Sequence, residues 1–112
     1  MHNVETIREE ELSDGQIESI VRLTNSVWPK EGLVLQERIE TLLTQIRSGE
    51  RTSLSATRFV VFEDREAIAH ALVFERTIFP LESDTQSISV LALAGVCSAG
   101  ERRGQGLGAA VV

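Results

Sequence analysis

Three glycines alternate with other residues near the end of the 112-residue sequence, in the segment Arg103-Gly104-Gln105-Gly106-Leu107-Gly108. Inside a helix each glycine costs roughly 1 kcal/mol relative to alanine, so such a cluster is typical of backbone that approaches a ligand closely. The first-turn amides of a helix have no internal partner and carry partial positive charge. Successive amides that point into one concavity bind phosphate oxygens. The segment therefore predicts a diphosphate site.

The residues before these glycines include two arginines and a predicted buried strand that would position the site. Ile88–Ser98 is apolar on both faces, which is typical of a central strand covered on both sides, and residues 99–103 join it to the glycines. Arg103 can donate charge-assisted hydrogen bonds to a phosphate, whereas Arg102 serves equally well as a solvated side chain. The pattern predicts a diphosphate site at the end of a buried strand. The alternative is a tight strand-to-helix turn that holds no ligand.

Several cofactors carry a diphosphate, and the sequence separates some of them. A Walker loop is excluded, because no Lys-Ser or Lys-Thr pair follows the last glycine. Gly104-x-Gly106-x-x-Ala109 has the form of the dinucleotide fingerprint. That fingerprint expects an acidic residue about 20 positions further on, and the sequence ends four positions after Gly108. A dinucleotide-binding module, for example one for NAD, is the weaker alternative.

Two amphipathic helices are predicted in the first half of the chain. Ser13 and Gln16 have the form of a capping box, and Pro29 disfavours helix at the residue before it. In the second helix Arg47 suits the negative helix end, and Gly49 suits a left-handed cap. The two apolar stripes have helical spacing; the first consists of Ile17, Ile20, Val21, Thr24 and Val27 or Trp28, and the second of Leu35, Ile39, Leu42, Leu43 and Ile46.

The other predicted elements are strands and one last helix. Val4–Arg8 is rich in β-branched residues and is predicted as the first strand. Residues 58–63 and 67–79 flank the polar turn Asp64-Arg65-Glu66 and are predicted as an antiparallel hairpin. Ile88–Ser98 is the fourth strand, and residues 104–112 begin a helix. The prediction is one α/β domain over residues 1–112, with a mixed α+β sheet and the order β-α-α-β-β-β-α.

The glycine motif and this order of elements resemble the amino-terminal part of the GNAT N-acetyltransferase superfamily. The family signature, Arg/Gln-x-x-Gly-x-Gly/Ala after the fourth strand, is matched by Arg103-Gly104-Gln105-Gly106-Leu107-Gly108. The opening IREEELSDGQIESIVRLTNSVWP looks like the family's first strand and helix, and the resemblance covers the whole chain. Gly100 stands where many members have proline, a departure that loosens the turn without removing an amide.

The resemblance implies an acyl-CoA-dependent N-acyltransferase. It would transfer acetyl from acetyl-CoA to a small-molecule or peptide amine by direct attack, without a metal. It also implies that an amide on the fourth strand stabilises the oxyanion. The alternative is a catalytically inactive acyl-CoA-binding remnant, or a subunit completed by another chain. The implied cofactor-binding residues are Arg103, Gly104, Gln105, Gly106, Leu107 and Gly108 for the CoA pyrophosphate, and the backbone of Val96, Cys97 and Ser98 for pantetheine.

Other candidate residues have simpler interpretations. Cys97 is expected to be a small core residue rather than a nucleophile, and Ser98 has no evident histidine partner. We expect His70 to be structural or exposed, Trp28 to pack in the core, and Glu9-Glu10-Glu11 to be a solvated charge run. No Asp or Glu lies between Ser87 and Gly100, so the general base is unassigned.

Composition argues against several classes of protein, including nucleic-acid-binding, metal-binding, secreted and membrane-spanning proteins. With 11 basic and 17 acidic residues the net charge is −6, which argues against a nucleic-acid-binding surface. Two histidines and one cysteine far apart suggest no metal site. A single cysteine fits a reducing, cytoplasmic location, and the acidic first residues do not resemble a signal peptide. The apolar run over residues 90–97 is too short to span a membrane.

The end of the sequence falls within the last predicted helix. That helix would be about nine residues long, which is short for a helix without tertiary support, and it ends on Ala109-Ala110-Val111-Val112. We therefore expect a domain truncated within the helix after the fourth strand, and incomplete at its C-terminus. The fourth strand would then present an apolar edge, which another chain, including a second copy, could complete.

Overall fold

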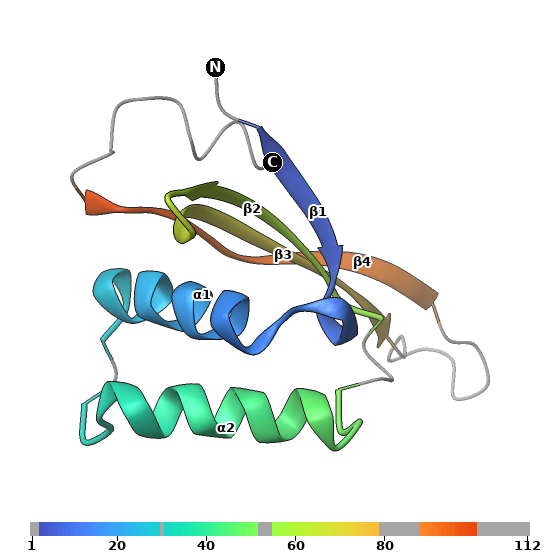
Figure 1. The fold of residues 1–112 in the computed structure, drawn as a ribbon. Helices are drawn as coiled ribbons and strands as arrows, with labels where there is room; N and C mark the ends of the chain where they lie inside the picture. The colour runs from blue at the N-terminus through green and yellow to red at the C-terminus, as the bar shows by residue number, and fades with distance from the viewer. Residues whose placement is uncertain (1–2, 30, 52–54, 79–87, 101–112) are drawn as a thin grey trace.

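The computed structural model describes residues 3–29, 31–51, 55–78 and 88–100. Its elements are β1 (Val4–Arg8), the 3-10 helix η1 (Glu9–Glu11), α1 (Asp14–Val27), α2 (Leu35–Arg47), β2 (Thr57–Glu63), β3 (Glu66–Ile78) and β4 (Ile88–Ser98). The four strands form one antiparallel sheet in the order β1-β2-β3-β4, with α1 and α2 stacked on one side of it (Figure 1). The predicted α/β class and the order of elements as far as β4 are confirmed. The helix predicted over residues 104–112 lies outside the described residues.

The ends of the two helices follow the predicted signals. The Ser13 hydroxyl accepts a hydrogen bond from the Gln16 N–H (3.2 Å), and the Gln16 side chain accepts one from the Ser13 N–H (2.9 Å), so the capping box is confirmed. The helix α1 ends at Val27, before Pro29. After α2, Gly49 has φ +82°, the left-handed conformation predicted for a cap at this position.

The prediction that Trp28 packs in the core is wrong, because its side chain is 49% exposed. It is the C-cap residue of α1, with φ −127°, so its backbone has already left the helix and its side chain leaves the apolar stripe. Arg38 of α2 donates hydrogen bonds to the Trp28 carbonyl (3.0 Å) and to Oδ1 of Asn25 (2.6 Å). The end of α1 is thereby fastened to α2 by polar contacts.

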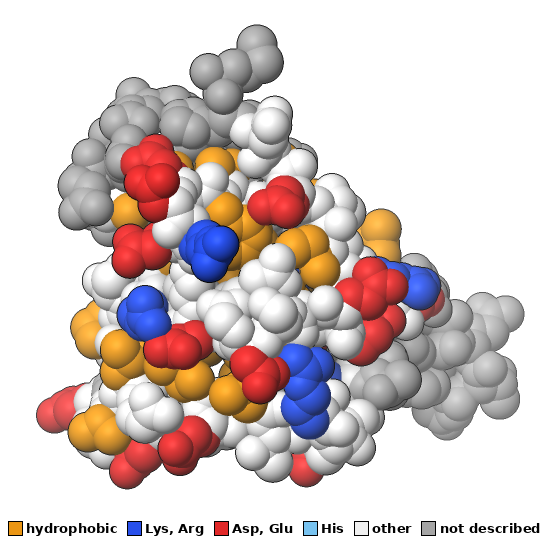
Figure 2. All heavy atoms as spheres, viewed as in Figure 1, with side chains coloured by type: hydrophobic (Ala, Val, Ile, Leu, Met, Phe, Trp, Pro, Cys, Tyr) orange, Lys and Arg blue, Asp and Glu red, His pale blue; other side chains and the backbone are white. Residues whose placement is uncertain are grey.

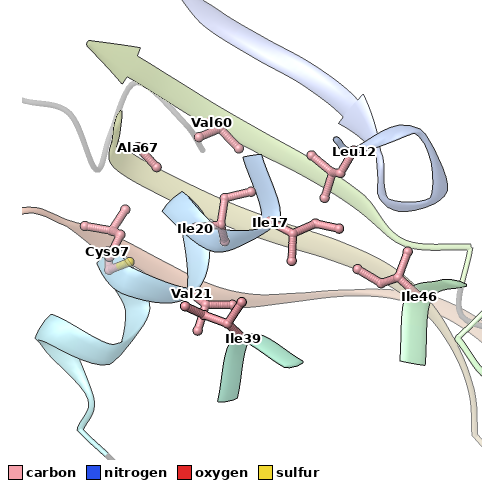
Figure 3. Close-up of a cluster of buried hydrophobic side chains, with 10 residues drawn as sticks. Leu12, Ile17, Ile20, Val21, Ile39, Ile46, Val60, Ala67 and Cys97 are labelled. Carbon is pink, nitrogen blue, oxygen red and sulfur yellow. The ribbon is translucent and has the colours of Figure 1, made fainter. Parts of the chain in front are cut away.

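The helix α1 lies between α2 and the sheet and contributes to the core with both (Figures 1 and 3). Its residues Ile17, Ile20 and Val21 are buried, as the predicted stripe requires. Cys97 is 7% exposed within the same cluster, which confirms the prediction of a small core residue. The cluster also contains Leu12, Leu23, Ile39, Ile46, Val60 and Ala67.

The hairpin of β2 and β3 turns more tightly than predicted. Asp64 and Arg65 have φ angles of 52° and 67°, as in a two-residue type I′ turn, and Glu66 already belongs to β3. Further along, Phe62 pairs with Ala67 and Val61 pairs with Ala69, so Ile68 is an extra residue in β3. This bulge is the register shift between β2 and β3. A second register shift lies between β3 and β4, where the extra residue belongs to β4.

The strand β4 is the last strand of the described sheet and pairs with β3 alone. Leu91 is 78% exposed and Leu93 is 52% exposed. The prediction of a central strand covered on both faces is therefore wrong for the described sheet, whereas the expected apolar edge is confirmed. An apolar pattern on both faces indicates that a strand could be buried on both sides. It does not establish that another element covers each side.

Candidate functional site

A bulge in β4 precedes the three residues that the sequence assigned to pantetheine. One residue of β3, Ala71, faces two residues of β4, Gly95 and Val96, because the register shifts by one position there. Gly95 has φ +61°, a conformation that glycine adopts at little cost and that is typical of a bulge with glycine in its first position. The pairs on either side are Leu72 with Ala94 and His70 with Cys97.

The bulge decides which backbone groups of β4 face the open edge. The N–H of Ala99 donates a hydrogen bond to the carbonyl of Ile68 in β3 (2.8 Å). Because successive residues of an antiparallel strand alternate in the direction of their N–H and C=O groups, those of Ser98 point away from β3. Edge groups of this kind can pair with an extended ligand as they would with another strand.

The structure places Val96, Cys97 and Ser98 together at the end of β4. Val96 is half-buried against a cluster on the sheet that includes Ala71, whereas the Cys97 side chain points into the core with α1 (Figure 3). Burial raises the pKa of the Cys97 thiol to about 11, so this cysteine is not poised as a nucleophile. Arg103 and the glycine motif over residues 104–108 lie outside the described residues, and the pyrophosphate site remains a prediction.

A hollow opens beside the end of β4. Ser19 is buried there, and its hydroxyl accepts a hydrogen bond from the N–H of Ala67 (2.6 Å). Arg22 is partly exposed and forms an ion pair with Glu18. The hollow thus presents one cation, one carboxylate and two hydroxyl groups next to β4. Its lining consists of Ser19, Arg22, Leu23, Ser26, Glu66, Ala67, Ala99 and Gly100.

Behind the bulge lies a buried polar network that joins β4, β3, β2 and η1. Nδ1 of His70 is 2.8 Å from the Gly95 carbonyl oxygen, and Nε2 of His70 is 3.1 Å from Nη1 of Arg58. Arg58 donates to the Glu9 carboxylate through Nε (3.0 Å) and Nη2 (2.8 Å), and Arg51 binds the same carboxylate. His70 is 1% exposed, Glu9 3% and Arg58 5%.

Sequence reasoning missed this network. Glu9 was expected to be solvated with its neighbours, and that prediction is wrong, because only Glu10 and Glu11 of the run are exposed. His70 was expected to be structural or exposed, and it is buried. One feature of the sequence indicates a buried Arg58. Arg58 and Val60 are two positions apart in a strand, so they share a face, and an apolar valine is expected on the face that packs in the core. An arginine on the core-facing side of a strand requires an acidic partner.

The electrostatics of the network follow from burial and from the two arginines. Burial, together with the positive charge of Arg58, lowers the pKa of His70 from 6.5 to about 4, so the imidazole is neutral at pH 7. Burial alone would raise the pKa of Glu9, but hydrogen bonds from Arg51 and the charge of Arg58 outweigh it and hold that pKa below its usual value. No buried side-chain nitrogen or oxygen atom of the described residues lacks a hydrogen-bond partner.

Metal sites and membrane-spanning helices are both absent from the described part of the chain. Within those residues no three His, Cys, Asp or Glu side chains are grouped as ligands for a metal ion. None of the described helices is both long and apolar enough to cross a membrane. The face shown in Figure 2 carries acidic and basic side chains interspersed, with no continuous basic patch on that face.

Comparison with known proteins identifies the fold by structure and not by sequence. No protein-family model matches the chain, and no curated protein matches it by sequence. The solved structures that match it in three dimensions include an acyl-CoA N-acyltransferase from Pseudomonas aeruginosa (TM-score 0.62, 16% identity), an acetyltransferase from Trypanosoma brucei (0.62, 17%) and glucosamine-6-phosphate N-acetyltransferase from Arabidopsis thaliana (0.61, 15%). The chain therefore has the fold of the N-acyltransferases.

The match covers nearly all of this chain and part of each longer protein. It spans 99% of the chain for the first structure and 97% for the other two. The chain corresponds to 64% of the Pseudomonas protein and to 69% of each of the other two. At identities of 15–17% the similarity shows the fold, and an activity has to be argued from the site itself.

Proposed function

We propose that the chain is the acyl-CoA-binding part of an N-acyltransferase that transfers an acetyl group from acetyl-CoA to an amine. The observation that carries this proposal is the bulged end of β4, where the backbone of Ser98 faces the open edge of the sheet. The fold shared with three acyltransferases supports it. So does the sequence that follows, because the match of residues 103–108 to an anion-binding motif begins five positions after the end of this strand.

Each part of acetyl-CoA has a place in this proposal. The backbone of Val96, Cys97 and Ser98 is assigned to pantetheine, and the N–H and C=O groups of Ser98, which face the open edge, pair with its amides. The side chain of Arg103 and the amides of residues 104–108 hold the pyrophosphate. The amine nitrogen attacks the thioester carbonyl carbon, the C–N bond forms, and the C–S bond breaks. CoA leaves as a thiolate that takes up the proton released by the amine, while an amide on β4 stabilises the charged carbonyl oxygen.

The described residues restrict the choice of general base. His70 uses both ring nitrogens in buried contacts, so it is not free to accept a proton. Glu75 pairs with Leu91, five positions before Val96, which at about 3.3 Å per residue places it roughly 17 Å along the strand from the bulge. A base must come within hydrogen-bond reach of the amine, directly or through one water. Neither residue meets this requirement.

A second candidate compatible with this restriction is an acyl-CoA-binding chain that does not catalyse transfer by itself. Of the titratable side chains described around the bulge, Cys97 has a raised pKa and His70 a lowered one, and both are buried. Neither can exchange a proton with a substrate at the edge of β4. In this candidate the base and the amine pocket belong to another polypeptide.

Two measurements on the purified 112-residue chain test the proposal. Calorimetric titration with acetyl-CoA, CoA and NAD should give binding of the first two and no binding of NAD. A thiol-release assay with acetyl-CoA and a panel of small amines and peptides then reports transfer, with little background because Cys97 is buried. Absence of acetyl-CoA binding would refute the proposal. Binding without amine-dependent release of CoA would favour the second candidate.

A further inference from the structure

The hydrogen bond between His70 and Gly95 joins the polar network to the bulge in β4. Nδ1 of His70 lies 2.8 Å from the Gly95 carbonyl oxygen. A Cβ atom placed on Gly95 would lie 3.1 Å from Cε1 of His70, so the imidazole also fills the space that a side chain at position 95 would need. The ring is therefore hydrogen-bonded to the bulged residue and also occupies the position that a side chain on that residue would take.

The partners of His70 determine its tautomer. Arg58 has only N–H donors, and its Nη1 lies 3.1 Å from Nε2 of His70. Nε2 must therefore accept this hydrogen bond, and the proton of the neutral ring resides on Nδ1. Nδ1–H then donates to the Gly95 carbonyl. Arg58 is itself held by Glu9 through two hydrogen bonds, of 3.0 and 2.8 Å, so the donor is aimed by a chain of buried contacts.

The bulge determines which of two possible pairing registers β4 adopts with β3 beyond Ala94. If the pairing of Leu72 with Ala94 continued without it, Ser98 would take the position opposite Ile68 that Ala99 occupies in the structure. At that position the N–H points toward β3, so the edge would lose the Ser98 amide. Cys97 would move opposite Ala69, and its side chain would turn to the other face of the sheet. The contact at Gly95 thus decides which amides β4 offers at its open edge.

We propose that His70 is a positioning residue for acyl-CoA binding: its Nδ1–H holds the Gly95 carbonyl, and thereby the bulge that turns the backbone of Ser98 to the open edge. This inference rests on the proposed function, because it assigns the edge of β4 to the acyl-CoA. His70 acts through the backbone of β4 and does not touch the ligand. Its neutral state agrees with the lowering of its pKa by burial.

A matched pair of variants separates positioning from mere packing. The side-chain amide of asparagine branches from Cγ, as Nδ1 does in histidine, so His70→Asn can still donate to Gly95. The amide of glutamine is one bond longer, so His70→Gln replaces Nε2 and its contact with Arg58. We expect His70→Gln to bind acetyl-CoA about tenfold more weakly than His70→Asn, the effect of one hydrogen bond. Unfolding in urea should show similar stabilities for the two variants.

A second measurement needs no variant. In the ¹⁵N spectrum of the wild-type imidazole the proton should reside on Nδ1, and amide contacts should pair residue 70 with residue 97. A proton on Nε2, pairing of residue 70 with residue 96, or equal acetyl-CoA affinities of the two variants would each overturn the proposal. If the wild-type chain binds no acetyl-CoA, the proposed function fails, and the spectrum still decides whether His70 holds the bulge.

Discussion

Oε2 of Glu9 lies 2.8 Å from Nη2 of Arg58, although the two residues are 49 positions apart in the sequence. The pair joins η1 to β2, and both side chains are almost completely buried. A buried ion pair adds little net stability when it replaces apolar packing, but removing one partner leaves an uncompensated charge. The pair is therefore a position at which a single neutral substitution has a large effect.

Replacement of Glu9 by glutamine should lower the free energy of unfolding by about 3 kcal/mol, because Arg58 would keep its charge in a buried site without a carboxylate. Urea unfolding at pH 7 measures this change. Glu11→Gln is the matched control, since Glu11 belongs to the same 3-10 helix and is exposed. It should change stability by less than about 0.5 kcal/mol. Equal effects of the two substitutions would contradict the role assigned to Glu9.

Stability should rise with pH between about 4 and 6.5. The pKa of His70 is lowered from 6.5 to about 4 in the folded chain, so within this window the unfolded chain binds a proton that the folded chain does not. The stabilisation is fully present above pH 6.5 and is lost as the pH falls through 4. The shift corresponds to roughly 3 kcal/mol.

Urea unfolding from pH 3 to 8 at low protein concentration measures this dependence. His70→Asn should remove most of the slope between pH 4 and 6.5. It should leave the slope at lower pH that Glu9 contributes, because the pKa of Glu9 is also lowered. A wild-type stability that stays flat between pH 5 and 6.5 would show that His70 is not buried in its neutral form.

Two glycines should respond in opposite ways to substitution by alanine. Gly95 has φ +61°, and a Cβ atom there would lie 3.1 Å from His70, so Gly95→Ala should destabilise the chain by about 2 kcal/mol and weaken acetyl-CoA binding. Gly15 lies in α1 with no atom within 4 Å of the added Cβ. Gly15→Ala should stabilise the chain by about 0.5–1 kcal/mol. Thermal unfolding of both variants tests the contrast, and a neutral Gly95→Ala would argue against a required bulge.

The local elements were predictable because their signals lie within a few residues. Ser13 and Gln16 mark the start of α1, and the apolar residues of each helix recur at its own period. The network of Glu9, Arg58 and His70 was not predictable in this way, because its members come from three elements and meet only after the sheet has formed. The bulge at Gly95 has the same origin: a glycine in an apolar strand permits a bulge, but the partner strand determines its register.

The glycine motif offers a test of the predicted pyrophosphate site. Gly106→Glu would introduce a carboxylate where the sequence predicts amides that bind an anion, so acetyl-CoA binding should be abolished. Gly15→Glu is a control, because Gly15 lies in the first turn of α1, is exposed, and an added Cβ there meets no atom within 4 Å. Calorimetric titration of both variants measures the effect. Unchanged affinity of Gly106→Glu would remove the glycine motif from the proposed site.

The backbone of Ser98 allows the most direct test of the β4 edge. Proline at position 98 would remove the N–H that points away from β3, while the hydrogen bond between Ala99 and Ile68 remains. Edge strands tolerate proline when the missing N–H faces away from the sheet, so Ser98→Pro should remain folded, with a loss of stability of about 1 kcal/mol or less.

Acetyl-CoA affinity should nevertheless fall by about tenfold or more in Ser98→Pro, because an edge hydrogen bond to the ligand is lost and the ring obstructs its approach. Ser98→Ala keeps the N–H and should bind acetyl-CoA as the wild-type chain does. If both variants bind with wild-type affinity, the ligand does not pair with this edge. If Ser98→Ala weakens binding as much as Ser98→Pro, the hydroxyl group and not the backbone makes the contact.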